Sequence, residues 1–136
     1  MTTDAAAVRG MPSRAWQAGQ TRRLEMIRSV AKVDGARVVD VGCGVGADAV
    51  HLAGAGARVT GLEVERPRAR EARTRGVAVV AAVAEALPFA DGTFDLVVSQ
   101  YGIEYARLEP AIGEALRVLA PGGRIALVLH HAGGRP

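Results

Sequence analysis

Short runs of valine, leucine and isoleucine alternate along this chain with longer segments that have helical spacing. The runs, interpreted as strands, lie at residues 37–41, 58–62, 77–80, 94–99 and 125–129. The segments interpreted as helices lie at about residues 14–32, 47–53, 67–75 and 110–119, each followed closely by glycine or proline. Strands connected through helices run parallel, with right-handed crossovers that place helices on both faces. The pattern predicts an α/β fold of the Rossmann-like class, a doubly wound parallel sheet of about five strands.

Length and composition fit a single globular domain. The chain has 136 residues, so we expect one domain over residues 1–136, with residues 1–12 as a flexible arm. Its 49% hydrophobic and 23% charged residues argue against disorder. The longest uncharged apolar run, residues 77–84, is too short to span a membrane, and the first ten residues do not resemble a signal peptide. We therefore expect a cytoplasmic protein without a membrane segment.

Charge and cysteine content exclude several classes of partner. Seventeen basic and fourteen acidic side chains give a net charge of +3, with both signs scattered along the chain. The arginines at 66, 68, 70, 73 and 75 are explained by a solvated helix face, so nucleic acid is not an expected partner. Cys43 is the one cysteine, which excludes an intrachain disulfide, and no metal site is expected.

Three glycines follow the first predicted strand at once. Gly42, Gly44 and Gly46 lie where a strand turns into a helix, and glycine lets the backbone approach a ligand closely. Their spacing is G-x-G-x-G, whereas a dinucleotide loop has G-x-G-x-x-G. Ala47 would satisfy a relaxed dinucleotide pattern, so that ligand class stays open. A tight turn without any ligand is the structural alternative.

An acidic residue ends the second predicted strand. Glu63 lies 17 residues beyond Gly46, at the sheet edge where the glycine loop is expected. A carboxylate there can accept hydrogen bonds from both hydroxyls of a ribose. The alternative is a solvated acid at a strand end. Together the loop and the acid predict a ligand that contains a nucleoside.

Three segments resemble a known enzyme family. Residues 39–46, VDVGCGVG, are similar to the first motif of class I S-adenosylmethionine-dependent methyltransferases. Residues 84–99 resemble the segment that spans the family's third and fourth strands, and residues 114–123, EALRVLAPGG, resemble its helix and turn before the fifth strand. The resemblance covers residues 37 to 129. It implies S-adenosylmethionine as cofactor, S-adenosylhomocysteine as product and methyl transfer by in-line displacement.

The resemblance also implies roles for particular positions. Asp40 and the glycine loop would face the methionine part of the cofactor, Glu63 would hold the ribose, and Ser99 would lie near the methyl-transfer face. Leu87 and Phe89 would form part of an apolar wall near the adenine. The complete set of implied cofactor-binding residues is Asp40, Gly42, Cys43, Gly44, Gly46, Glu63, Val83, Ala84, Glu85 and Ser99.

The acceptor is expected to be a small molecule. Residues 99–102, SQYG, lack the Asn/Asp-Pro-Pro-aromatic signature of enzymes that methylate planar amines of nucleobases or glutamine. Transfer from a sulfonium needs mainly proximity and orientation, although some acceptors need a general base. Tyr101, Glu104 and His130 are weak candidates for that base, and the sequence identifies no catalytic residue.

The chain departs from the family in two ways. Val83 stands where the family often has an acid that accepts a hydrogen bond from the adenine amine; losing that bond would cost about fivefold in affinity. Family members also continue past the fifth strand to complete a seven-stranded sheet, so we expect a truncated fold. The run at 125–129 would then be an exposed edge, through which the chain could form a homo-oligomer.

Two alternative functions stay open from the sequence. The first is a noncatalytic module, or a fragment that needs a partner chain, which binds a nucleoside cofactor without transferring a group. The second is half of a nicotinamide-linked oxidoreductase. The segments at 87–89 and 117–123 argue against this second alternative because they match the methyltransferase pattern.

Overall fold

The computed structural model describes residues 14–100, 102–103 and 106–128. The predicted arm at residues 1–12 lies outside these ranges, as do the candidate bases Tyr101, Glu104 and His130. Within the described ranges, no helix is long and apolar enough to cross a membrane.

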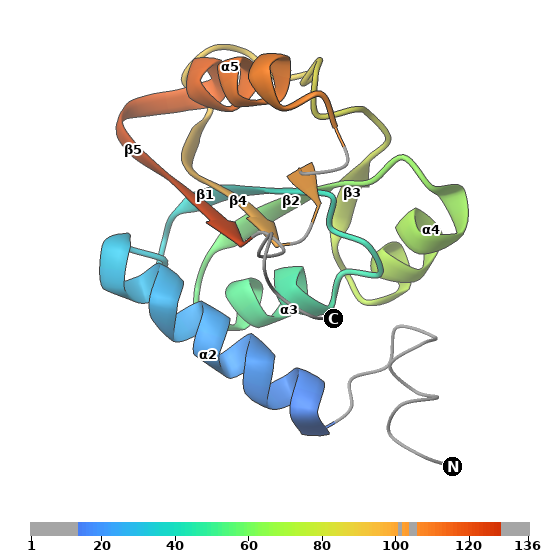
Figure 1. Cartoon of the computed structure of the whole chain (residues 1–136). Helices are drawn as coiled ribbons and strands as arrows, with labels where there is room; N and C mark the ends of the chain where they lie inside the picture. Colours follow the sequence, from blue (N-terminus) through green and yellow to red (C-terminus); the bar gives the residue numbers. More distant parts are fainter. Residues whose placement is uncertain (1–13, 101, 104–105, 129–136) are drawn as a thin grey trace, which may run out of the picture.

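The described strands form one five-stranded parallel sheet with the order β3-β2-β1-β4-β5. The strands are β1 (Arg37–Val41), β2 (Arg58–Leu62), β3 (Ala78–Val80), β4 (Phe94–Gln100) and β5 (Leu119–Val128). The first two coincide with the predicted runs. The predicted doubly wound sheet is therefore confirmed (Figure 1).

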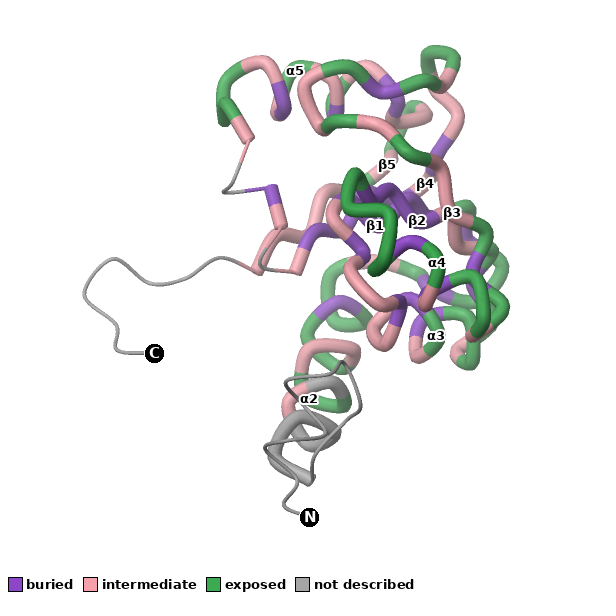
Figure 2. Tube along the Cα trace, turned by 90° about the vertical axis from the view of Figure 1, so that its right-hand side faces the viewer, coloured by how far each residue is buried: buried purple, intermediate pink, exposed green. Residues whose placement is uncertain are grey.

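Helices cover both faces of the sheet. They are α2 (Arg14–Val30), α3 (Ala47–Gly54), α4 (Arg66–Thr74) and α5 (Leu108–Val118). The chain moves outward in one direction from β1 to β3 and in the other direction from β4 to β5. Right-handed crossovers then require helices on opposite faces. Accordingly α5 covers one face, whereas α2, α3 and α4 lie on the other (Figures 1 and 2).

The core consists of two layers that alternate along each strand. Val38 and Leu96 pack with Leu52 of α3 on one face. Val39 and Val97, their neighbours in sequence, pack on the opposite face in a cluster that includes residues of α5. This alternation follows from the two-residue period of a strand. It leaves the central strands almost fully buried.

The last strand begins earlier than predicted. Leu119 already pairs with Phe94, and the register then shifts so that Arg124 pairs with Leu96. The intervening residues bulge out of the ladder around Gly122, whose φ is +80°. The sequence PGG predicted a turn here, and the bulge accommodates it within the strand. Because β5 ends the strand order, it is an edge of the described sheet, as expected.

Candidate cofactor site

A pocket of about 590 Å³ opens at the carboxyl ends of the strands. It lies beside β1, where the strand order reverses between β1 and β4, the point at which open α/β sheets bind ligands. Its volume falls in the range of small-molecule sites. It is lined by Val41, Gly42, Leu62, Glu63, Val64, Glu65, Arg68, Ala82, Val83, Ala84, Glu85, Gly102 and Ala106.

The glycine loop adopts backbone conformations that other residues rarely adopt. Gly42, Gly44 and Gly46 have φ values of +74°, +58° and +85°. A Cβ on Gly46 would lie 3.0 Å from Cβ of Ala72 and 3.0 Å from Cγ2 of Val77, so the loop packs directly on α4 and on the residue that precedes β3. The backbone N–H of Gly42 donates to the carbonyl of Leu62 at 2.8 Å. The loop is thus fixed against β2.

Glu63 connects the end of β2 to the glycine loop. Its side chain lines the pocket although only 7% of the residue is exposed. Oε1 accepts a hydrogen bond from the Gly44 N–H at 2.9 Å, and Oε2 accepts one from the Glu65 N–H at 3.0 Å. A carboxylate offers about four acceptor positions, so two are left for a ligand.

Asp40 lies near the end of β1 and is not among the residues that line the pocket. It is 2% exposed, and none of the described residues forms a hydrogen bond or an ion pair with its carboxyl group. Burial, followed by the charges of Asp48 and Glu63, raises the pKa of Asp40 to about 8. The carboxyl group is therefore mostly protonated at neutral pH.

Cys43 is not a reactive thiol. It is buried in the glycine loop, and burial raises the pKa of its thiol to about 12. The thiolate required for nucleophilic attack is therefore scarce at neutral pH. Its sulfur packs against β2, since a Cβ on Gly61 would lie 2.6 Å from the Cys43 sulfur.

Two glycines bring β1 and the segment after β4 together. A Cβ on Gly42 would lie 3.0 Å from Cα of Gly102, and a Cβ on Gly102 would lie 2.6 Å from the carbonyl oxygen of Val41. Backbone therefore packs on backbone at this point. Gly102 lines the pocket, and the sequence analysis did not select it.

Ser99 stabilises the same junction. It is completely buried, and its hydroxyl donates to the carbonyl oxygen of Val41 at 2.8 Å. The Ser99 hydroxyl oxygen in turn accepts the Ile103 N–H at 2.8 Å. Ser99 thus ties the segment after β4 to β1 and does not line the pocket.

The far wall of the pocket comes from the segment after β3. Val83 is 50% exposed, and the Glu85 carboxylate accepts the Arg107 N–H at 3.0 Å. Leu87 and Phe89, expected as an apolar wall near the adenine, instead belong to the core cluster under α5. The Phe89 ring packs edge-on against Phe94, with centroids 4.9 Å apart.

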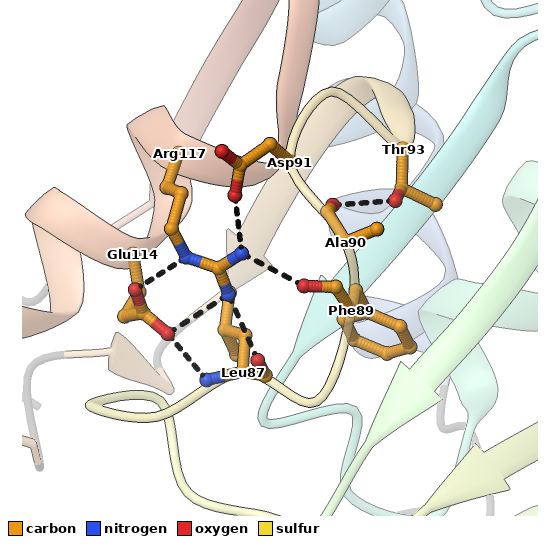
Figure 3. A network of polar contacts seen from close by, with 7 residues as sticks. All are labelled: Leu87, Phe89, Ala90, Asp91, Thr93, Glu114 and Arg117. Atoms are coloured by element: carbon orange, nitrogen blue, oxygen red, sulfur yellow. Dashed lines mark hydrogen bonds and ion pairs between the residues drawn. The ribbon is translucent and has the colours of Figure 1, made fainter.

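Arg117 of α5 holds the segment that continues from this wall (Figure 3). Its guanidinium donates to the carbonyl oxygens of Leu87 at 2.9 Å and Phe89 at 2.8 Å. It also donates to the carboxylates of Asp91 at 2.8 Å and Glu114 at 2.7 Å. Glu114 in turn accepts the Leu87 N–H at 2.8 Å. One side chain thus fixes a segment that has no regular secondary structure.

Helix α2 is attached to the same end of the sheet. The Arg23 Nε donates to Oε1 of Gln100 at 2.7 Å, and its Nη2 lies 3.2 Å from Oδ1 of Asp48. Arg23 therefore links α2 to the end of β4 and to the first turn of α3.

Comparison with known proteins identifies this architecture. A family profile described as "Methyltransferase domain" matches residues 39–127, which is most of the chain. The chain belongs to this family. The predicted resemblance to class I S-adenosylmethionine-dependent methyltransferases is confirmed.

Relatives of the methyltransferase domain include two named enzymes. A malonyl-[acyl-carrier protein] O-methyltransferase of Pseudescherichia vulneris is 38% identical over 104 residues, covering 74% of this chain and 41% of the relative. A demethylmenaquinone methyltransferase of Clavibacter sepedonicus is 39% identical over 115 residues, covering 79% of this chain and 46% of the relative. The chain thus spans about half the length of these relatives.

Solved structures support the fold. The crystal structure of an S-adenosylmethionine-dependent methyltransferase from Thermotoga maritima superimposes with a TM-score of 0.69 at 31% identity. The match covers 79% of this chain and 50% of that protein. The doubly wound sheet of this methyltransferase domain is therefore shared with it.

The structure divides the predicted cofactor residues of the methyltransferase domain into two groups. Gly42, Glu63, Val83, Ala84 and Glu85 line the pocket, whereas Asp40, Cys43, Gly44, Gly46 and Ser99 do not. Lining residues that were not predicted include Gly102, Ala106 and Arg68. Gly102 could have been found, since it follows closely on the end of β4 at the same sheet edge. No described group of His, Cys, Asp and Glu side chains could hold a metal ion.

Proposed function

We propose that this domain binds S-adenosylmethionine in the pocket and that the protein methylates a small-molecule acceptor. The observation that carries the proposal is the Glu63 carboxylate, which is bonded to Gly44 and lines a pocket of about 590 Å³. A carboxylate in this position can accept hydrogen bonds from the ribose hydroxyls of a nucleoside. That the nucleoside is S-adenosylmethionine is inferred from membership of the methyltransferase family.

The residues present fit that cofactor. Glu63 would hold the ribose, and Val83, Ala84 and Glu85 would flank the adenine. Asp40, buried without a partner among the described residues, would lie toward the methionine part together with the glycine loop. Gly42 leaves the backbone accessible to a ligand because no side chain covers it.

When bound, S-adenosylmethionine supplies a methyl group activated by positively charged sulfur. The task of the chain is then to bind, to orient and to exclude water. Aligning the acceptor accounts for most of the acceleration such a displacement needs. Tyr101, Glu104 and His130 stay our candidates for a general base.

A small-molecule acceptor is supported by two observations. The segment after β4 lacks the proline pair typical of enzymes that methylate planar amines. The two named relatives carry acceptors in their names, a malonyl group on a carrier protein and demethylmenaquinone, neither of which is a nucleic acid. A cytoplasmic location also stays our prediction.

Calorimetry with S-adenosylhomocysteine tests the proposal. We expect wild-type protein to bind S-adenosylhomocysteine. The affinity of Glu63→Ala should be lower by about tenfold or more, because hydrogen bonds to a carboxylate are lost. Glu65→Ala is the matched control: its exposed side chain also lines the pocket. Equal affinity in wild type and Glu63→Ala would refute the ribose assignment. No binding to wild type, with stabilisation by NAD instead, would refute the cofactor.

Turnover distinguishes an enzyme from a noncatalytic module. Protein that binds S-adenosylmethionine should convert it to S-adenosylhomocysteine in the presence of an acceptor, which mass spectrometry detects. Acceptors of the two named chemical types, a carrier-bound malonyl group and a quinone precursor, form the first panel. Binding without conversion across the panel would favour the noncatalytic alternative.

We also propose that two copies associate through β5. The support is its place at the edge of the described sheet, where backbone groups have no further strand to pair with. Light scattering after size exclusion should give the mass of a dimer. A monomer at all concentrations would contradict this proposal.

A further inference from the structure

The Glu85 carboxylate joins two walls of the pocket. Glu85 belongs to the wall after β3, and its Oε2 accepts the backbone N–H of Arg107 at 3.0 Å. Arg107 directly follows Ala106, which lines the pocket from the segment between β4 and α5. This one hydrogen bond therefore connects two parts of the pocket lining through residues that are 22 positions apart in the sequence.

The wall that contains Ala106 is also fixed from the β1 side, through buried groups. The Ser99 hydroxyl donates to the carbonyl oxygen of Val41 and accepts the Ile103 N–H, each at 2.8 Å. The Ile103 carbonyl oxygen in turn accepts the Ala106 N–H at 3.0 Å. Ser99 and Ile103 are almost completely buried, whereas the hydrogen bond to Glu85 is exposed to solvent. The hydrogen bond to Glu85 is thus the one for which water competes most directly.

The start of α5 explains why the Arg107 N–H takes an acceptor from another segment. Arg107 is the residue that precedes the first turn of α5, where backbone N–H groups have no partner within the helix. In a capping box the third helical residue supplies the acceptor, but in α5 that residue is Pro110, which has no polar side chain. The hydrogen bond from Arg107 holds the pKa of the Glu85 carboxyl below its ordinary value, and the helix dipole also favours a carboxylate at this end. The Glu85 carboxylate is therefore ionised and bonded to Arg107 before a ligand binds.

We propose that Glu85 is a positioning residue of the pocket: its carboxylate holds the Ala106 wall in place and does not accept the adenine amine. The inference rests on the proposed function, in which residues 83–85 flank the adenine. Of these three residues only Glu85 has a side chain that accepts hydrogen bonds, so recognition of the amine by its carboxylate is the alternative. A wall that is fixed in advance loses less conformational entropy when a ligand binds.

Amide hydrogen exchange, followed by NMR, measures the hydrogen bond in the ligand-free chain. Glu85→Ala should speed exchange of the Arg107 amide proton several-fold because the acceptor is lost. Glu109→Ala is the matched control, since it removes an exposed carboxylate from the first turn of the same helix and should leave this exchange unchanged. Unchanged exchange of the Arg107 amide in Glu85→Ala would overturn the inference.

Two ligands separate positioning from recognition of the base. S-Adenosylhomocysteine carries the adenine amine, whereas S-inosylhomocysteine carries a carbonyl oxygen at that place, and calorimetry of the full chain measures both affinities. If the carboxylate positions the wall, Glu85→Ala should weaken both ligands by the same factor of about five, the equivalent of one hydrogen bond. The ratio of the two affinities should then equal the ratio in wild type.

Two other results would overturn the inference and leave the proposed function standing. An affinity ratio that falls toward one in Glu85→Ala would mean that the carboxylate accepts the adenine amine. Unchanged affinities together with faster Arg107 exchange would mean that the hydrogen bond stabilises α5 without positioning the pocket wall. Failure of wild-type protein to bind S-adenosylhomocysteine would overturn both the inference and the proposed function.

Two conservative variants keep the test decisive if Glu85→Ala is unstable. Glu85→Gln removes the charge and keeps an acceptor oxygen, so both affinities should stay within about twofold of wild type. Glu85→Asp keeps the charge, but its carboxylate is one methylene shorter and should no longer reach the Arg107 N–H, so both affinities should fall as in Glu85→Ala. The reverse order, with Glu85→Asp like wild type and Glu85→Gln impaired, would mean that the charge supports binding and would overturn the inference.

Discussion

The backbone N–H of Gly44 lies 2.9 Å from Oε1 of Glu63, so the glycine loop and the carboxylate assigned to the ribose are joined directly. The other oxygen of the same carboxylate accepts the Glu65 N–H at 3.0 Å. Both ends of the group are thus held at the pocket before a ligand arrives. A group that is already oriented loses less conformational entropy on binding.

The first prediction concerns the two backbone hydrogen bonds that the Glu63 carboxylate accepts. Glu63→Gln keeps one acceptor oxygen, so one of the two backbone N–H groups faces an amide NH₂ instead. We expect the ligand-free protein to lose about 1–2 kcal/mol of unfolding free energy. Urea denaturation measures this loss, and Glu65→Gln is the control because its side chain is exposed. Unchanged stability of Glu63→Gln would contradict the two hydrogen bonds.

Two glycines of the loop should respond differently to alanine. Both have positive φ, but a Cβ on Gly44 would meet nothing within 4 Å, whereas a Cβ on Gly46 would contact Ala72 and Val77 at 3.0 Å. Gly44→Ala should therefore cost about 1 kcal/mol of backbone strain. Gly46→Ala adds overpacking and should cost about 2–4 kcal/mol. Equal losses in denaturation would contradict the contact with α4.

The unfolding free energy of the ligand-free protein should depend on pH because of Asp40. Its folded pKa of about 8 exceeds the unfolded value of about 3.9, so between these values the folded state keeps a proton that the unfolded state has lost. Unfolding free energy contributed by this group therefore falls as pH rises through that window. Asp40→Asn should gain about 1–3 kcal/mol over wild type between about pH 4.5 and pH 8.

Denaturation at the two pH values measures that difference. Asp34→Asn, at an exposed position, is the control and should show little dependence on pH relative to wild type. A constant difference between Asp40→Asn and wild type would show that Asp40 is ionised in the folded protein.

Val83 tests the placement of the adenine. The side chain lines the pocket and is 50% exposed, so an aspartate there would meet water or ligand without being buried. If the adenine amine lies beside it, Val83→Asp should tighten binding of S-adenosylhomocysteine by about fivefold, because one hydrogen bond is gained. Calorimetry measures the change. Clear weakening would reject this placement.

Local patterns predicted much of the fold. β1 and β2 match the predicted runs residue for residue, since each is an apolar run bounded by glycine or by a change to polar residues. The edge at which Glu63 meets the glycine loop also followed from the rule that parallel strands end together. The early start of β5 did not, because Leu119 joins the sheet through a distant partner, Phe94.

Packing between distant segments decided what the sequence could not predict. The contact of Gly102 with Gly42 depends on how closely β1 and β4 approach. The burial of Ser99 depends on the same junction, although its position after the fourth run resembled a ligand-facing one. That no described residue forms a hydrogen bond or an ion pair with the Asp40 carboxyl group depends on side chains from several segments and is not visible in the sequence.

The last prediction concerns Arg117, which holds the segment beyond the pocket wall through the carbonyl oxygens of Leu87 and Phe89. A lysine cannot supply several donors in the fixed geometry of a guanidinium. Arg117→Lys should therefore speed amide hydrogen exchange at residues 87–91 several-fold and weaken S-adenosylhomocysteine binding. Arg37→Lys is the matched control: Arg37 makes a comparable pair with Asp95 at 2.9 Å, at the amino ends of β1 and β4 and therefore at the end of the sheet opposite the pocket. Because Arg37 is remote from the pocket, its replacement should leave exchange at 87–91 and ligand affinity unchanged. Equal effects of the two variants would mean that Arg117 acts on overall stability and not on the pocket wall.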